Sequence, residues 1–256
     1  MSENQVEMLR VGEAASARDI AVLRRTGAGP GLFWLGGFAS DMRGSKAEAL
    51  DGFAATSGRA FTRFDYSGHG ASGGAFAEGT ISRWLEEARA VFATTEGPQV
   101  VVGSSMGGWL ALLLAESLRT TGRVAGLVLI APAVDMTRAL MFDEMTKAQK
   151  KELAEAGAVA LPSDYSAAGY TITKALIDDG EAHLFGERLI ETGCPVHILQ
   201  GVEDSDVPWQ HATALVSRLA SDDVVLTLVK DGDHRLSRPE DLARMIAAVE
   251  GVTEME

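Results

Sequence analysis

Short apolar runs alternate with longer amphipathic stretches along most of the chain, and this alternation predicts a twisted, mostly parallel sheet flanked by helices. We expect leading strands near residues 6–9 and 20–23, and further strands at residues 31–35, 60–64, 99–102, 124–130, 196–199 and 224–229. Helices are expected from residue 45, over 81–94, over 106–118 and after each of the last two strands. The pattern favours a single α/β domain spanning residues 1–256.

Residues 133–192 depart from this alternation. They show amphipathic helical stretches and a turn at residues 161–164 (LPSD), but no good strand pattern. Ligands of open α/β sheets bind at the carboxyl edge of the strands, so we interpret this segment as a helical lid inserted over that edge. The alternative is a helical surface elaboration that contacts no ligand.

Charge and cysteine content narrow the classes of partner. Lys and Arg number 23 against 36 Asp and Glu, a net charge of −13, which argues against nucleic acid and anionic membrane surfaces as partners. The single cysteine, Cys194, excludes an internal disulfide and a cysteine-rich metal cluster. No apolar stretch approaches the about 20 residues of a membrane span. Residues 1–10 lack a secretory or transit pattern, so we expect a cytoplasmic protein.

One serine lies between a predicted strand and a predicted helix. Residues 103–107 read GSSMG, with Ser105 at the centre. A serine on such a sharp turn holds its hydroxyl clear of the sheet, and the helix dipole favours negative charge beside it. Residues 70–74 (GASGG) match the same G-x-S-x-G pattern, but Ser72 lies in a glycine-rich loop that no helix follows. We therefore predict Ser105 as a nucleophile and Ser72 as a turn residue.

A serine nucleophile needs a base, and His234 has the most suitable position among five histidines. It lies in the turn after the last predicted strand, at the sheet edge where Ser105 is expected. We interpret the others as packed, surface or loop residues: His197 in a strand, His211 on a helix, His183 in the insertion and His69 in a loop. For His69 the alternative is a place at the mouth of the site.

Three carboxylates compete to orient the histidine. Residues 201–209 (GVEDSDVPW) follow the penultimate strand and contain Glu203, Asp204 and Asp206. A carboxylate there would hold the imidazole by one nitrogen, fix its tautomer and stabilise the imidazolium. Its place in the turn favours Asp204, and Asp206 stays open as the rival.

Acyl transfer also needs two main-chain N–H groups that stabilise an oxyanion. One belongs to Met106, the residue after the nucleophile, and we assign the other to Phe38, which follows Gly36 and Gly37 after an apolar strand. Because both groups are main-chain, the side chains at these two positions are free to vary.

These residues resemble the α/β-hydrolase superfamily. More narrowly, the chain is similar to the acyl-protein thioesterase family of alpha/beta-hydrolase domain-containing protein ten and its bacterial relatives. The similar segments follow one another over nearly the whole chain: GFASDMRGSKAEAL, FTRFDYSGHGASGG, EGPQVVVGSSMGGWLAL, LPSDYSAAGY, CPVHILQGVEDSDVPW and GDHRLS. Many superfamily members carry His-Gly before the oxyanion residue, where this chain has Gly36-Gly37.

The resemblance implies an α/β-hydrolase fold and hydrolysis of S-palmitoyl-type thioesters and carboxylic esters, including acyl glucuronides, without metal or cofactor. It places the catalytic roles on Ser105, Asp204 and His234, and so prefers Asp204 to Asp206. The expected substrate is a small acyl ester or thioester, or an S-acylated protein. The sequence leaves the oligomeric state open.

Four apolar residues of the insertion are candidates for an acyl-binding wall, because methionine adapts to irregular shapes: Met136, Met141, Phe142 and Met145. The alternative is that they pack the insertion onto the core. A general carboxylesterase acting on small or xenobiotic esters is the alternative function. A peptidase, a cofactor-free haloperoxidase and a non-catalytic ligand-binding protein share the same fold class.

Overall fold

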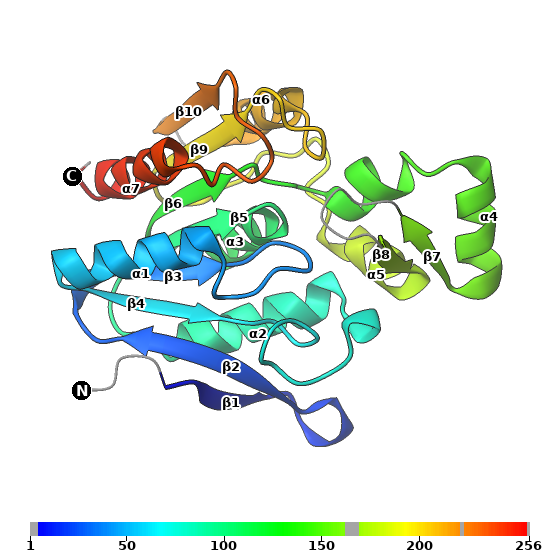
Figure 1. Cartoon of the computed structure of the whole chain (residues 1–256), viewed down its shortest axis with the longest axis horizontal. Helices are drawn as coiled ribbons and strands as arrows, with labels where there is room; N and C mark the ends of the chain where they lie inside the picture. Colours follow the sequence, from blue (N-terminus) through cyan, green and yellow to red (C-terminus); the bar gives the residue numbers. More distant parts are fainter. Residues whose placement is uncertain (1–4, 162–168, 221–222, 255–256) are drawn as a thin grey trace.

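One large sheet organises the computed structural model, which describes residues 5–161, 169–220 and 223–254. Its eight strands have the order β1-β2-β4-β3-β5-β6-β9-β10 (Figure 1). The strands β1 and β2 are antiparallel to their neighbours, and the other six are parallel. The strands are β1 Glu7–Val11, β2 Arg18–Arg25, β3 Ala28–Leu35, β4 Arg59–Phe64, β5 Gln99–Ser104, β6 Val124–Ile130, β9 Val196–Gly201 and β10 Val224–Val229. This confirms the predicted mostly parallel sheet.

Helices cover both faces of the sheet. The helices α1 (Ser45–Ser57) and α7 (Pro239–Glu254) lie on one face, and α2 (Ile81–Ala93), α3 (Met106–Leu118) and α6 (Trp209–Arg218) lie on the other (Figure 1). Short 3-10 turns, η1 (Ala14–Ser16) and η2 (Phe76–Glu78), interrupt the loops. No helix of the described residues combines the length and the apolar character that crossing a bilayer requires.

The strand β3 shows why its apolar residues are continuous rather than alternating. Leu32 and Trp34 pack into the core beneath α1 and α7, whereas Phe33 and Leu35 pack into the core beneath α2 and α3. A parallel strand that is covered on both faces buries every side chain, and all four residues are buried. The sheet therefore separates the two large apolar cores.

The segment between β6 and β9 forms a separate projection at the end of the sheet toward which the parallel strands point (Figure 1). It contains a π-helical turn η3, two helices, a two-stranded antiparallel sheet and a 3-10 turn η4. Their bounds are η3 Thr137–Phe142, α4 Lys147–Ala156, β7 Ala158–Leu161, β8 Tyr170–Thr173, α5 Lys174–Gly180 and η4 Glu181–His183.

The expectation of an entirely helical insertion is wrong, because β7 and β8 pair with each other over four residues each. Strands this short carry little periodic signal, and they gain their hydrogen bonds only from one another. The predicted turn at residues 161–164 lies, beyond Leu161, outside the described residues.

The two ends of the insertion are joined at its base. The buried Asp135 accepts hydrogen bonds from the backbone N–H groups of Phe185 (2.8 Å) and Gly186 (3.0 Å). Arg218 of α6 pairs with the same carboxylate, and His211 of α6 bonds the carbonyl oxygen of Val134 at 2.8 Å. The start and end of the insertion are therefore fixed to each other and to the body of the protein.

The turn from β5 into α3 is the tightest point of the fold. Ser105 occupies it with φ 55° and ψ −118°, a backbone conformation that L residues avoid. A side chain on Gly107 would overlap the carbonyl oxygen of Leu35, and one on Gly103 would overlap the backbone of Gly107. Glycine at both positions lets β5, β3 and the first turn of α3 approach closely enough to hold Ser105 in place.

We expect Gly107→Ala to destabilise the protein by about 3 kcal/mol, because the added methyl group overlaps backbone atoms that have little room to move. The matched control is Gly52→Ala in α1, where nothing lies within 4 Å of the added carbon. Replacing this helical glycine should stabilise the protein by about 0.5–1 kcal/mol. Urea unfolding measures both changes, and equal effects at the two positions would contradict the role of close packing at the turn.

Candidate active site

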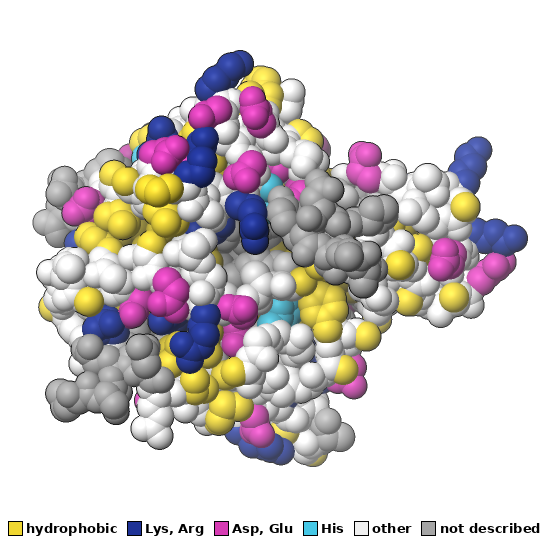
Figure 2. Space-filling view, in the orientation of Figure 1, with side chains coloured by type: hydrophobic (Ala, Val, Ile, Leu, Met, Phe, Trp, Pro, Cys, Tyr) yellow, Lys and Arg dark blue, Asp and Glu magenta, His cyan; other side chains and the backbone are white. Residues whose placement is uncertain are grey.

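A cavity of about 850 Å³ lies between the sheet edge and the insertion. Its walls come from the loops after β3, β5, β9 and β10, the start of α1, and the insertion. Figure 2 shows the hollow near the middle of this face, with charged, histidine and apolar side chains around its margin. Both Ser105 and His234 line it.

The structure brings together the three residues that the sequence singles out. The Oγ atom of Ser105 lies 3.1 Å from Nε2 of His234, and Nδ1 of His234 lies 2.8 Å from Oδ2 of Asp204. The three residues come from the turns after β5, β9 and β10, which end at the same edge of the sheet. With Nδ1–H donating to Asp204, Nε2 of the neutral ring is the nitrogen that accepts from the serine hydroxyl.

Hydrogen bonds occupy both oxygens of the Asp204 carboxylate, whose side chain is fully buried. Oδ1 accepts from the backbone N–H groups of Asp206 (2.9 Å) and Val207 (2.8 Å). Oδ2 accepts from Nε2 of Gln200 at 3.0 Å and from His234. This set of donors fixes the direction of the carboxylate.

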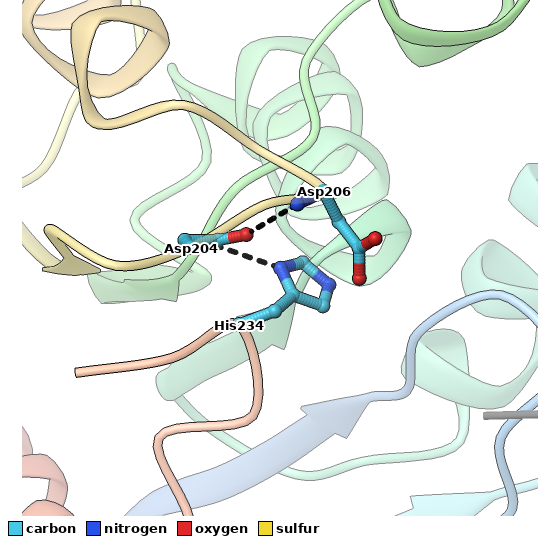
Figure 3. A group of neighbouring side chains, drawn as sticks. All are labelled: Asp204, Asp206 and His234. Carbon is cyan, nitrogen blue, oxygen red and sulfur yellow. Dashed lines mark hydrogen bonds and ion pairs between the residues drawn. The ribbon is translucent and has the colours of Figure 1, made fainter. Parts of the chain in front are cut away.

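Asp206 contributes its backbone N–H, whereas its exposed carboxylate extends away from the oxygen of Asp204 that its N–H contacts (Figure 3). Asp204, Asp206 and His234 place ligand atoms within 4.8 Å of one another, which is compatible with a metal site by distance alone. A cation bound by Asp204 would have to displace hydrogen bonds that already fill its lone pairs. The donor set therefore suits an orienting carboxylate better than a metal ligand.

The two expected oxyanion donors, Met106 and Phe38, stay predictions, and the structure gives the backbone around them. Met106 is the first residue of α3, so its N–H is one of those that a helix leaves without an intrahelical partner. A carbon added to Gly37 would lie 3.4 Å from Cβ of Ser105, so the backbone leading to Phe38 passes next to the serine. The Phe38 ring packs edge to face against three aromatic side chains, those of Phe76, Trp84 and Tyr170.

His69 restrains the loop that carries Phe38 and Ala39. Its Nε2 accepts a hydrogen bond from the N–H of Ala39 at 3.1 Å, and its Nδ1–H donates to the carbonyl oxygen of Ser67 at 3.1 Å. Burial lowers the pKa of the His69 imidazole, which keeps the ring neutral and able to accept. Ala39 has φ 56°, so this bond restrains a strained residue next to Phe38. His69 therefore has a structural place in the fold, and it contacts the loop that carries Phe38, the expected oxyanion donor.

The other histidines lie away from the cavity lining. His197 of β9 bonds Thr227 of β10 at 2.9 Å, and His183 bonds Ser82 at 2.7 Å. Ser72 bonds the backbone of Ala21 and Asp65 and does not line the cavity.

The insertion forms an apolar wall. Apart from Glu144, its lining side chains are apolar or aromatic: Ala133, Met136, Leu140, Met141, Leu161, Tyr170 and Ile172. Phe142 and Met145 are absent from this lining, so for them the expected acyl contact is not supported. Phe142 lies beneath the cations of Arg138 and Lys150 at 5.3 and 4.9 Å, and Met145 is buried in the core. Periodicity does not distinguish the side of a short helical turn that faces a cavity from the side that faces a core.

Sequence reasoning missed several residues of the site, among them Gln200, Lys46 and Trp34. Gln200 lies in β9 among apolar neighbours, and a polar residue in a buried strand was a signal that it has a partner. Lys46 and Trp34 line the cavity from α1 and β3, and no local motif marks them.

Comparisons with known proteins identify the family. The family described as serine aminopeptidase, S33 matches residues 43–182. Mouse palmitoyl-protein thioesterase ABHD10, a mitochondrial protein, is 36% identical over 91% of this chain and 78% of its own length.

Two solved structures are similar to this chain over nearly their whole length. A putative hydrolase from Agrobacterium vitis has a TM-score of 0.94 and 50% identity, over 98% of this chain and 99% of the other. The alpha/beta hydrolase domain-containing protein 10 from mouse has a TM-score of 0.88 and 34% identity, over 98% of both chains. The predicted α/β-hydrolase fold is therefore confirmed, and the chain belongs to the ABHD10 family of α/β hydrolases.

Proposed function

We propose that this hydrolase cleaves acyl thioesters and carboxylic esters through an acyl-enzyme on Ser105. The observation that carries the proposal is the hydrogen-bonded series from Ser105 through His234 to Asp204, at 3.1 and 2.8 Å, in the wall of a substrate-sized cavity. The relatives named palmitoyl-protein thioesterases support an acyl thioester as substrate. The apolar wall formed by the insertion supports an acyl chain as the part that is bound.

The reaction proceeds in two halves. His234 takes the proton of Ser105 as Oγ attacks the carbonyl carbon, and the N–H groups of Met106 and Phe38 stabilise the oxyanion. The carbon–sulfur or carbon–oxygen bond breaks, and His234 gives its proton to the leaving thiol or alcohol. His234 then removes a proton from water, whose oxygen attacks the acyl carbonyl carbon. The bond between that carbon and Oγ breaks, and His234 returns the proton to Oγ, which releases the acid and Ser105. Asp204 stabilises the imidazolium in both halves.

We expect a fluorophosphonate probe to label the protein rapidly and Ser105→Ala to abolish the labelling. The same variant should lower kcat by at least about 10⁴-fold, because it removes the hydroxyl that lies 3.1 Å from Nε2 of His234. Ser72→Ala, which alters the second match to the serine motif, should remain labelled. Labelling that persists in Ser105→Ala would contradict the assignment of the nucleophile.

A panel of thioesters and oxyesters of increasing chain length tests the substrate class. We expect kcat/KM to rise with chain length for both series, because longer chains bury more area against the apolar wall. A maximum at short oxyesters without thioester turnover would instead support the general carboxylesterase. Cleavage of an aminoacyl amide in place of every acyl ester would support a peptidase and contradict the proposal.

Asp204→Asn should lower kcat by about 10³–10⁴-fold, because an amide does not stabilise the imidazolium and favours the wrong histidine tautomer. Asp206→Asn is the matched control, since it keeps the backbone N–H that bonds Asp204 and changes only an exposed carboxylate. Its effect on kcat should be far smaller. Steady-state kinetics at pH 7–8 distinguish the two variants, and a larger loss in Asp206→Asn would reverse their roles.

His69→Ala should lower kcat by about 10- to 100-fold with little change in KM, because the loop that carries Phe38 loses its restraint on Ala39. The control is His197→Ala, which removes a bond to Thr227 outside the cavity. Because the pKa of His69 is lowered by burial, the ring stays neutral at pH 7, and a charged ring would no longer accept from Ala39. A rise in KM without a fall in kcat would contradict a positioning role.

A further inference from the structure

The wall of the cavity that faces the insertion is polar, in contrast to the apolar wall described above. It comes from β3, the start of α1 and the turn after β10, and its side chains are Trp34, Asp41, Ser45, Lys46, Arg235 and Ser237. Trp34 belongs to the core beneath α1 and α7. The apolar lining residues of the insertion belong to the core beneath α2 and α3. The two walls therefore lie on different sides of the sheet edge that carries Ser105.

Two cationic side chains lie together on this polar wall. The ammonium group of Lys46 donates a hydrogen bond to the carbonyl oxygen of Arg235, which ties the start of α1 to the turn that carries His234. Burial and the positive charge of Arg235 lower the pKa of Lys46 to about 8, against the opposing charges of Asp233 and Asp241. Both cationic residues line the cavity, where an anionic group of a bound substrate would be attracted to them.

Neutral donors reinforce the cations. The helix α1 begins after Gly44 without a side-chain cap, and Gly44, Ser45 and Lys46 at its start line the cavity. The buried indole N–H of Trp34 has no hydrogen-bond partner among the described residues. The wall also holds one carboxylate, that of Asp41, which accepts from the backbone N–H of Arg43 at 2.7 Å.

The position of His234 decides which part of a substrate this wall would meet. In the proposed reaction His234 donates its proton to the leaving sulfur or oxygen, so the leaving group must lie beside its ring. Arg235 follows His234 directly and Ser237 lies two residues further, and both line the cavity. The acyl chain has its own apolar wall on the insertion.

We propose that Lys46 and Arg235 form a subsite for a small oxyanion, a carboxylate or a phosphate, carried by the leaving thiol or alcohol. This proposal rests on the proposed function, because the subsite would bind the leaving-group end of the substrate in that same reaction. The preferred substrates are then acyl esters and thioesters whose leaving group is acidic.

The test uses thioesters that share one acyl group and differ in the thiol. The thiols are 3-mercaptopropionate, its uncharged amide, and 2-mercaptoethyl phosphate, which separates a carboxylate from a phosphate as the preferred anion. We expect kcat/KM for one or both charged thioesters to exceed that for the amide by about tenfold, the effect of a hydrogen bond to a charged group. The measured quantity is the ratio of charged to neutral, so a general loss of activity cancels.

Lys46→Gln and Arg235→Gln should each bring this ratio towards one. Arg235→Gln retains the backbone carbonyl that Lys46 contacts, so it tests the charge without breaking the bond that ties α1 to the His234 turn. Arg10→Gln, an exposed cation on the edge strand β1, is the control and should leave the ratio unchanged.

Equal kcat/KM for charged and uncharged thioesters in the parent protein would overturn the subsite. A charged-to-uncharged ratio of kcat/KM that stays at the parent value in both variants would overturn it as well. Failure of the proposed function has a different signature, because none of the three thioesters would then be hydrolysed.

Discussion

The active-site geometry depends on one backbone constraint, the turn at which β5 becomes α3. The backbone of Ser105 has a positive φ that its side chain disfavours, and Gly103 and Gly107 allow the surrounding chain to close around it. The N–H of Ser105 donates to Ile130 at 2.9 Å, and its carbonyl oxygen accepts from Ala133 at 3.1 Å. These contacts bind the turn to β6 and to the start of the insertion, so the serine hydroxyl has a fixed direction before any substrate arrives.

Further strain lies in the neighbouring loops. Apart from Ser105, positive φ values occur at Ala39 beside Phe38, at Ala131 after β6, at Asp135 in the base of the insertion and at Leu236 close to His234. Each of these loops follows a strand or anchors the insertion, and each is fixed by hydrogen bonds or burial. Backbone strain at a site is compensated by stable packing elsewhere, and the two apolar cores supply that packing.

The sequence was most informative where one local pattern determines the structure. The helix at residues 106–118 has the predicted bounds, because an apolar strand, a glycine-framed serine and an apolar helix leave few alternatives. The choice between Asp204 and Asp206 was open from the residues alone, because it depends on which carboxylate the turn directs inward. The backbone N–H groups of Asp206 and Val207 direct Asp204 inward, and this is a property of the folded turn. The pairing of β7 with β8 and the place of Lys46 on the cavity wall depend likewise on tertiary contacts.

The topology explains why one cavity has two kinds of wall. In a sheet covered on both faces, successive residues of a strand enter different cores, as Trp34 and Leu35 do in β3. The cavity at the carboxyl edge is lined by residues of both cores, and Ser105 and His234 also line it. The insertion adds apolar side chains to one side only, because it leaves the sheet after β6 and returns at β9, so the side next to α1 keeps its polar groups.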